Sequence, residues 1–255
     1  MSVVIFFGLL LVVLFGVALG SFLNVVVLRW PDKLLTGRSY CPNCKKKLSA
    51  WELIPIFSYL FILGRCIKCK TRISAQYPLV EFIVGVVAAM ILFSFLKNPV
   101  NPVGSLIQFF IVYVLIILFL IDLRTFLLPD LYILILTGLA ILNVLLIPSF
   151  MASAFGGALI GSGFLLILWI ITKHRGIGFG DVKLMVPLGL YFGVVNTVLV
   201  LYFSFIIGGL VGILLLVSKK ATMKTAVPFG PFLAGVAILY ILFPGIPDFL
   251  LNLIA

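Results

Sequence analysis

Long apolar segments recur along the whole chain, separated by short stretches that are polar or contain glycine and proline. Each segment has close to 20 residues, the length that an α-helix needs to cross about 30 Å of hydrocarbon. The pattern predicts an all-α membrane protein with about eight transmembrane helices. We expect these helices at residues 3–28, 78–96, 103–121, 131–148, 152–172, 183–195, 197–217 and 228–244. The break between the sixth and seventh segments is weak, so seven helices is the alternative.

The composition supports a membrane protein, and the distribution of charge indicates how the chain is oriented in the membrane. Hydrophobic residues make up 64% of the 255 residues and charged residues 10%, which excludes an ordinary soluble domain. If the N-terminus lies outside, every Lys and Arg except Lys97 falls at an inner loop. The net charge of +11 therefore indicates orientation in a lipid bilayer and not a nucleic-acid partner. No basic residue precedes the first segment and Arg29 follows it, so we interpret it as a retained helix and not as a cleaved signal.

One long polar region separates the first two predicted helices. It divides the chain into a first transmembrane segment at 1–28, a cytoplasmic domain at 29–77 and a transmembrane bundle at 78–255. Two Cys-x-x-Cys pairs in this domain can supply four thiolates to one tetrahedral, structural zinc ion. Four unligated thiols or two disulfides are the alternatives, and the reducing cytoplasm disfavours disulfides. The predicted zinc ligands are Cys41, Cys44, Cys66 and Cys69.

Asp181 is one of only seven acidic residues and lies in a glycine-rich loop between two apolar segments. An ionised carboxylate beside a bilayer core is costly, so such a residue is a candidate for function. The neighbouring glycines carry no side-chain bulk and would let another chain approach closely. The alternative is a loop whose aspartate caps the following helix.

Asp122 is a second acidic residue at the inner end of an apolar segment, at a depth comparable with that of Asp181. Asp130 follows Pro129 and is better placed to cap a helix, so we favour Asp122 as the partner of Asp181. Two aspartates brought close cannot both ionise easily, and one of them then keeps a proton. Such a pair suits peptide hydrolysis, because the ionised carboxylate can activate water while the protonated one donates to the scissile carbonyl.

These residues belong to an ordered series of motifs that resembles the type IV prepilin peptidases, intramembrane aspartyl proteases of the Gly-x-Gly-Asp class. The series runs through most of the chain and is highly specific as a set. It consists of Gly20-Ser-Phe-Leu-Asn24, Leu53-Ile-Pro with Ser58-Tyr59, Gly64-Arg-Cys66, Tyr77-Pro-Leu-Val-Glu81, Asp122 with Leu128-Pro-Asp130, Gly178-Phe-Gly180-Asp181-Val-Lys183, and Pro228-Phe-Gly-Pro-Phe.

The resemblance implies an enzyme that removes the basic leader from prepilins or pseudopilins at the cytoplasmic face of the bacterial inner membrane. Many members then N-methylate the new terminal residue with S-adenosylmethionine, and the cysteine domain is typical of those bifunctional members. Carried over by motif, Asp122 and Asp181 are the catalytic pair. Gly64, Glu81 and Lys183 are candidates for substrate binding or methyl transfer.

Simpler roles exist for several of these residues. Glu81 could stabilise the helix dipole in the first turn of the segment at 78–96. Lys183 could extend to the interface as ordinary positive-inside charge. Ser21 and Asn24 share a helical face, and we expect them to hydrogen-bond another helix.

Two other functions fit parts of the pattern. One is a leader peptidase without methyltransferase activity, in which the cysteine domain only holds the substrate. The other is an ion-coupled transporter, whose acidic residues are expected near mid-span, whereas Asp122 and Asp181 lie at the inner edge. The motifs do not specify the oligomeric state or the individual pilins.

Overall fold

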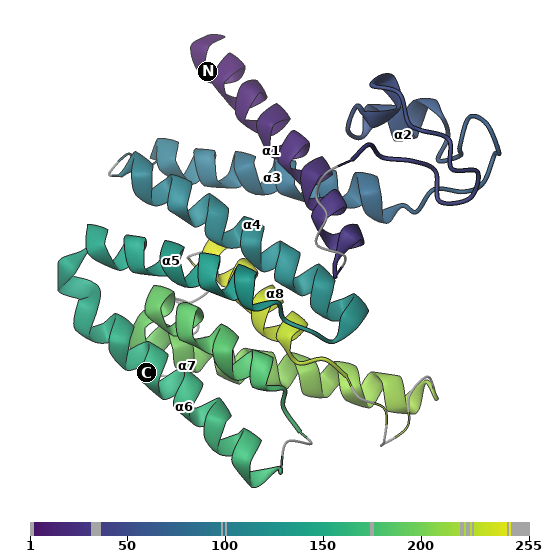
Figure 1. The fold of residues 1–255 in the computed structure, drawn as a ribbon. Coiled ribbons are helices and arrows are strands. Elements are labelled where there is room, and N and C mark those ends of the chain that lie inside the picture. Colours follow the sequence, from purple (N-terminus) through teal and green to yellow (C-terminus); the bar gives the residue numbers. More distant parts are fainter. Residues whose placement is uncertain are drawn as a thin grey trace. The chain divides into compact units, whose positions relative to one another are not determined.

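The structure, a computed structural model, describes residues 3–31, 37–97, 99, 101–173, 176–219, 222, 225, 227–243 and 245. Over these residues the chain is mostly helical outside the segment at 37–75, and its only β pairing is two isolated bridges, Tyr40 with Lys47 and Arg65 with Arg72. The chain forms two compact units, Met1–Val100 and Asn101–Ala255 (Figure 1). The predicted all-α class is confirmed.

The first unit pairs two long helices, α1 (Val3–Arg29) and α3 (Gln76–Lys97). Between them lie the short helices η1 (Trp51–Leu53) and α2 (Phe57–Phe61). A Cβ atom at Gly20 would lie 2.7 Å from Glu81 Cα, so the absence of a side chain lets the helices touch. Such small-residue contacts are typical of helix pairs in membranes. One turn further, Asn24 Nδ2 donates to Tyr77 O at 3.1 Å, which confirms the expected bond to another helix.

The second unit is a bundle built around α4 (Pro102–Thr125). Around it lie α5 (Asp130–Leu146), η2 (Pro148–Phe150), α6 (Met151–Ile171), α7 (Phe179–Val217) and α8 (Gly230–Leu242). The Asn101 side chain caps α4 by accepting from Val103 N and Gly104 N at 3.1 Å each. The α4 side chains form much of the core, since Val112, Leu115 and Leu118 are fully buried. Burial of this kind on most faces of one helix fixes the other helices around it.

The long helix α7 reverses direction at Gly193. A single Cβ atom at Gly161 of α6 would lie 3.0 Å from Met185 Cγ and 2.8 Å from Thr197 Cγ2. In a straight helix, residues 185 and 197 would be roughly 18 Å apart, because each residue adds about 1.5 Å. The backbone of Gly193 has φ 69° and ψ −176°, a combination that is essentially restricted to glycine. The helix therefore consists of two segments, both packed along α6 (Figure 1). The weak break expected near this position is a sharp turn.

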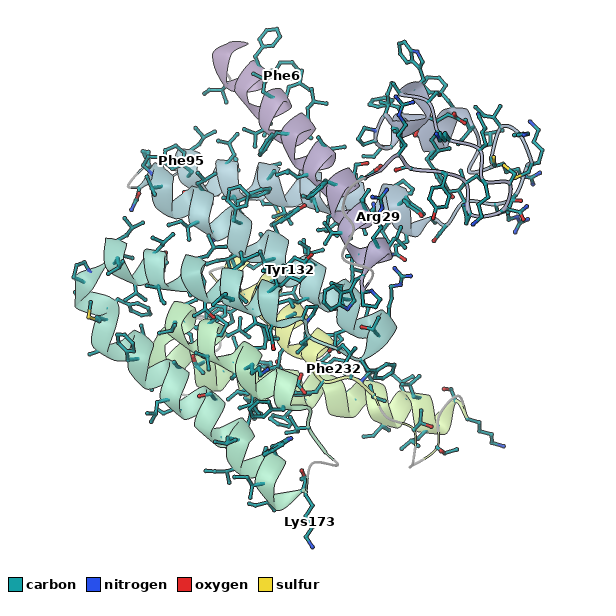
Figure 2. All side chains as sticks on the ribbon, viewed as in Figure 1. Phe6, Arg29, Phe95, Tyr132, Lys173 and Phe232 are labelled. Carbon is teal, nitrogen blue, oxygen red and sulfur yellow. The ribbon has the colours of Figure 1, made fainter. Side chains whose placement is uncertain are left out.

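Five helices among the described residues are long and apolar enough to cross a membrane: α1, α3, α4, α6 with η2, and α7. The helices α5 and α8 are apolar but shorter. Large apolar side chains such as Phe6, which Figure 2 shows projecting from α1, and Leu11 are more than half exposed on the outer faces, as lipid contact requires. The chain is thus a multi-pass membrane protein, and the count of eight spans stays a prediction.

We predict that Gly193→Val lowers the thermal unfolding midpoint of the protein in detergent, measured by tryptophan fluorescence. Valine strains this backbone conformation by about 1–3 kcal/mol. Its Cβ would also lie 2.5 Å from Ser153 Oγ and 2.8 Å from the Phe150 ring. Gly209→Val is the matched control, because a Cβ there meets nothing within 4 Å. Equal midpoints for the two variants would contradict the proposed role of the turn.

Candidate active site and metal centre

Asp122 and Asp181 lie at two helix ends in the second unit. Asp122 is in the last turn of α4 and Asp181 in the first turn of α7. Their exposed fractions are only 4% and 5%, so both carboxyl groups are almost fully removed from solvent. The start of this helix was predicted too late, at residue 183, because α7 already begins at Phe179. Asp181 therefore lies in the helix and not in the loop before it.

Gly230, the first residue of α8, marks the point at which the two carboxyl groups meet. A Cβ atom at this glycine would contact Asp122 Oδ2 and would lie 3.2 Å from Asp181 Oδ1. The two aspartates are also close enough to interact electrostatically. The ends of α4, α7 and α8 therefore converge on one small space that two carboxylate oxygens face.

The two oxygens of Asp181 have different surroundings. The backbone N–H of Gly178, the residue that caps α7, donates to Asp181 Oδ2 at 3.0 Å. The other oxygen, Oδ1, faces Gly230 and the Asp122 side. The helix-cap role weighed from the sequence is thus present, and it orients the side chain without occupying the oxygen that faces Asp122.

Leu128 covers the same space. Its Cδ1 atom would lie 3.2 Å from a Cβ at Gly230 and 3.3 Å from a Cβ at Gly180. Larger residues at either glycine would displace this leucine or fill the space beside the carboxyl groups. Sequence reasoning matched Leu128 and Gly230 as parts of motifs but gave them no role, because only tertiary packing brings them to the aspartates.

Asp130 is held apart from the pair by a different contact. Its Oδ1 accepts from Lys183 Nζ at 2.8 Å, and its side chain is 75% exposed. The Lys183 ammonium also lies 5.3 Å from the centre of the Phe179 ring. Lys183 is therefore engaged with Asp130 and Phe179, and the structure brings Asp122, not Asp130, to Asp181.

The four cysteines of the first unit form a second cluster. Cys41 Sγ lies 3.7 Å from Cys69 Sγ, and Cys44 Sγ lies 3.9 Å from Cys66 Sγ. All four sulfurs lie within 4.8 Å of one another, and all four cysteines are free. Sulfurs bound tetrahedrally at about 2.3 Å from a zinc ion are separated by roughly 3.8 Å, whereas a disulfide bond is about 2.05 Å long. The cluster has the spacing of a metal site, not that of two disulfides.

Both cysteine pairs have the same local geometry. Lys45 N donates to Cys41 O at 3.0 Å and Lys70 N donates to Cys66 O at 2.9 Å. The residue after each pair takes a positive φ, 55° at Lys45 and 58° at Lys70. The tight turns point the sulfurs of each pair in one direction, so that two similar half-sites face one another.

The surroundings of the sulfurs favour thiolates at some positions. The hydroxyl and the backbone of Thr71 lower the pKa of Cys69 to about 5. The Lys46 backbone lowers the pKa of Cys44, but burial and the other three sulfurs outweigh it and raise that pKa to about 11. Four adjacent thiolates repel one another unless a cation balances them. A divalent metal ion is the partner that this donor set fits.

In the comparison with known proteins, both units match domains of leader peptidases. Residues 14–95 match the bacterial peptidase A24 N-terminal domain, and residues 109–213 match the type IV leader peptidase family. A prepilin leader peptidase/N-methyltransferase of Aeromonas hydrophila is 34% identical, with 88% of this chain and 87% of the relative covered. A protein of the same name from Pseudomonas putida is also 34% identical, covering 86% and 85%. The chain belongs to the type IV leader peptidase family.

A third relative, from Burkholderia pseudomallei strain 1026b, carries the same name and is 34% identical, with 94% of this chain and 86% of the relative covered. No solved structure matches the chain. The match to the type IV leader peptidase family spans both Asp122 and Asp181, and the N-terminal match spans the four cysteines.

Two further candidates of this leader peptidase, Gly64 and Glu81, lie in the first unit. Glu81 is only 7% exposed, and its Oε2 accepts from Ile56 N at 2.7 Å. The helix α3 begins at Gln76 and has no acidic residue in its first turn, so the suggestion that Glu81 stabilises the helix dipole there was wrong. Gly64 has φ 64°, and a Cβ there would lie 2.8 Å from the Tyr59 ring. It supports Tyr59 by leaving room for that ring.

We predict one thiolate-bound metal ion per purified chain. Exchange with Co²⁺ should give sulfur-to-cobalt charge-transfer absorption, and Cys66→Ser should remove both this absorption and most of the bound metal, because a four-ligand closed site loses one donor. Lys68→Ala, an exposed change inside the same cysteine pair, is the control. Unchanged metal content in Cys66→Ser would argue against the site.

Proposed function

We propose that this chain is an intramembrane aspartic endopeptidase that removes the leader peptide from type IV prepilins or pseudopilins and N-methylates the new N-terminus. The observation that carries the proposal is the meeting of two buried carboxyl groups, Asp122 and Asp181, at Gly230. Relatives that match this chain over most of its length bear the name of both activities.

Hydrolysis needs no group beyond the two aspartates and water. The ionised carboxylate takes a proton from water as the water oxygen attacks the scissile carbonyl carbon, and the protonated carboxyl gives its proton to the carbonyl oxygen. Collapse of the tetrahedral intermediate breaks the C–N bond, and the leaving nitrogen receives a proton from the pair. The two carboxyl groups exchange roles and then return to their starting state.

The positions of the glycines suit an extended substrate. Gly180 and Gly230 border the carboxyl groups without side chains, and a Cβ at either site would meet Leu128. A peptide backbone has to come within hydrogen-bonding distance of both aspartates, so small residues are required around them. The Gly178 N–H keeps Asp181 in place while the substrate enters.

The distribution of basic residues supports a cytoplasmic active site. Arg124, Lys173 and Lys183 lie at the ends of α4, α6 and α7, and Figure 2 shows Lys173 projecting from the end of α6. Asp122 and Asp181 lie at the same ends of α4 and α7. The positive-inside rule then orients these ends toward the cytoplasm of a bacterial inner membrane and leaves the N-terminus outside.

Two cofactors complete the proposal. Zinc is the structural metal that the four-cysteine cluster would hold, because the spacing and ligand type fit it and the closed site leaves no position for substrate. S-adenosylmethionine would supply the methyl group. Gly64, Glu81 and Lys183 stay candidates for this second activity, although the Lys183 ion pair with Asp130 leaves it the least favoured.

We predict that Asp122→Asn and Asp181→Asn each reduce the rate of leader cleavage by at least about 100-fold, because each removes one partner of an acid–base pair. The assay is cleavage of a prepilin by the purified variant in detergent, followed by gel electrophoresis.

Asp130→Asn is the matched control, since it makes the same change at an exposed aspartate nearby. We expect its cleavage rate to stay within a few-fold of that of the unmodified protein. Full activity in either of the first two variants, or loss in Asp130→Asn alone, would move the catalytic pair elsewhere.

We also predict that Gly230→Ala reduces cleavage by about 100-fold, the effect of moving reacting groups by about 1 Å. The added methyl group would contact Asp122 Oδ2 and crowd Asp181 Oδ1. Gly235→Ala on the same helix is the control, because a Cβ there lies 3.6 Å from the Phe119 ring, an ordinary contact. Thermal unfolding of both variants separates a local effect from a loss of fold, and an active Gly230→Ala variant would count against the convergence at this glycine.

A further inference from the structure

A cavity of about 400 Å³ lies within the first unit, between the four-cysteine segment and the paired helices α1 and α3. The end of α1, the first cysteine pair, α2 and the start of α3 all contribute to its walls. Its volume falls in the range of small-molecule sites. Cys41 and Cys66, the two buried cysteines of the cluster, also line it.

A buried carboxylate lies in the wall of this cavity. Glu81 Oε2 accepts from Ile56 N at 2.7 Å, and Ser21 lines the same cavity. A backbone N–H orients the carboxyl group without balancing a negative charge on it, and no ion pair of Glu81 occurs among the described residues. The carboxylate therefore lacks a cation, which is the partner that buried charges ordinarily require.

A buried acceptor without a partner lies beside it. Asn24 is 2% exposed and lines the cavity, and its Nδ2 donates to Tyr77 O. Its Oδ1 has no hydrogen-bond partner within the part of the chain that the structure describes. An unsatisfied buried acceptor is unfavourable, so a ligand that donates a hydrogen bond to it would remove this cost.

The backbone next to the carboxylate is strained. Ile56 has φ 60° and ψ −55°, a conformation that β-branched residues almost never adopt. It is from this residue that the N–H reaches Glu81. Such strain is unfavourable and persists only where the surrounding structure holds the residue in place, as it does at many ligand-binding sites.

Aromatic rings and a basic side chain complete the walls. Tyr59 and Tyr77 line the cavity, and the faces of tyrosine rings attract cations such as ammonium and sulfonium. Gly64 leaves room behind Tyr59 and so positions that ring. Arg29 also lines the cavity and offers a cation to a ligand carboxylate. The cavity walls thus contain an acidic group, a hydrogen-bond acceptor, aromatic rings and a cation that one small ligand could contact.

We propose that this cavity is the binding site for S-adenosylmethionine, an inference that rests on the proposed methyltransferase activity. The ligand carries an ammonium, a sulfonium and ribose hydroxyls, which suit Glu81, Asn24 and the tyrosine faces, and a carboxylate, which suits Arg29. When bound, it supplies a methyl group to the uncharged α-amine of the cleaved substrate: a C–N bond forms, the C–S bond breaks with its electron pair left on sulfur, and the amine nitrogen loses one proton.

The test measures equilibrium binding of labelled S-adenosylmethionine to the full chain in detergent, alongside leader cleavage and the mass of the mature N-terminus. Glu81→Gln keeps the shape and the acceptor for Ile56 N but removes the charge. We expect it to weaken binding by about 10- to 100-fold, the effect of one hydrogen bond to a charged group, and to lower methylation while cleavage stays within two-fold. Lys97→Gln, at the far end of α3, is the control.

Asn24→Ala provides a second variant, and photocrosslinking of the labelled ligand to the unmodified protein provides a measurement that no variant can confound. Crosslinks within residues 21–29 or 37–81 support the cavity, and crosslinks confined to 101–243 overturn it. Normal binding in both Glu81→Gln and Asn24→Ala also overturns it. If the unmodified protein cleaves but neither binds the ligand nor methylates, the proposed methyltransferase activity fails together with the cavity, whereas the aspartate pair stands.

Discussion

The removal of two carboxyl groups from water at one point is the constraint on which the second unit depends. Asp122 and Asp181 lie almost fully buried at the ends of separate helices, and both face Gly230. Burying two acids side by side is unfavourable for folding, and it is tolerated only when surrounding groups hold them. The tight contacts of α4 with α8, the cap at Gly178 and the cover from Leu128 supply that support. The positions of these helix ends therefore follow from the requirement that both buried carboxyl groups be enclosed by packed groups.

Close packing at small residues stabilises the association of these helices, as hydrophobic burial does in a soluble protein. Lipid is as apolar as the helix surfaces, so association in a membrane relies on contact between backbones. Gly20 lets α1 reach α3, and Gly193 both reverses α7 and lets it lie against α6. The fold of each unit depends on such positions, and an added methyl group at one of them has to move a helix.

Much of this could be predicted from the sequence, because apolar length and cysteine spacing are local signals. The order and approximate positions of the long helices, the grouping of the four cysteines and the choice of Asp122 over Asp130 as the neighbour of Asp181 agree with the structure. The roles of Leu128 and Gly230 could not be predicted, since only packing brings them beside the aspartates. Hydropathy predicted that the helix begins at residue 78, which put Glu81 in its first turn. The helix begins earlier, because polar Gln76 and aromatic Tyr77 already belong to it, so Glu81 lies beyond the first turn.

The reason for an acidic residue at position 81 differs from the reason at Asp122 and Asp181. An amide in its place could still accept from Ile56 N. This contact therefore explains a buried acceptor, but it does not explain an acid, whose burial in the charged form costs more than that of an amide. A cationic group of a ligand would give a charge at this position a partner. Tyr59 and Tyr77 line the same space, and tyrosine rings attract cations, so the wall suits a ligand that carries a positively charged group.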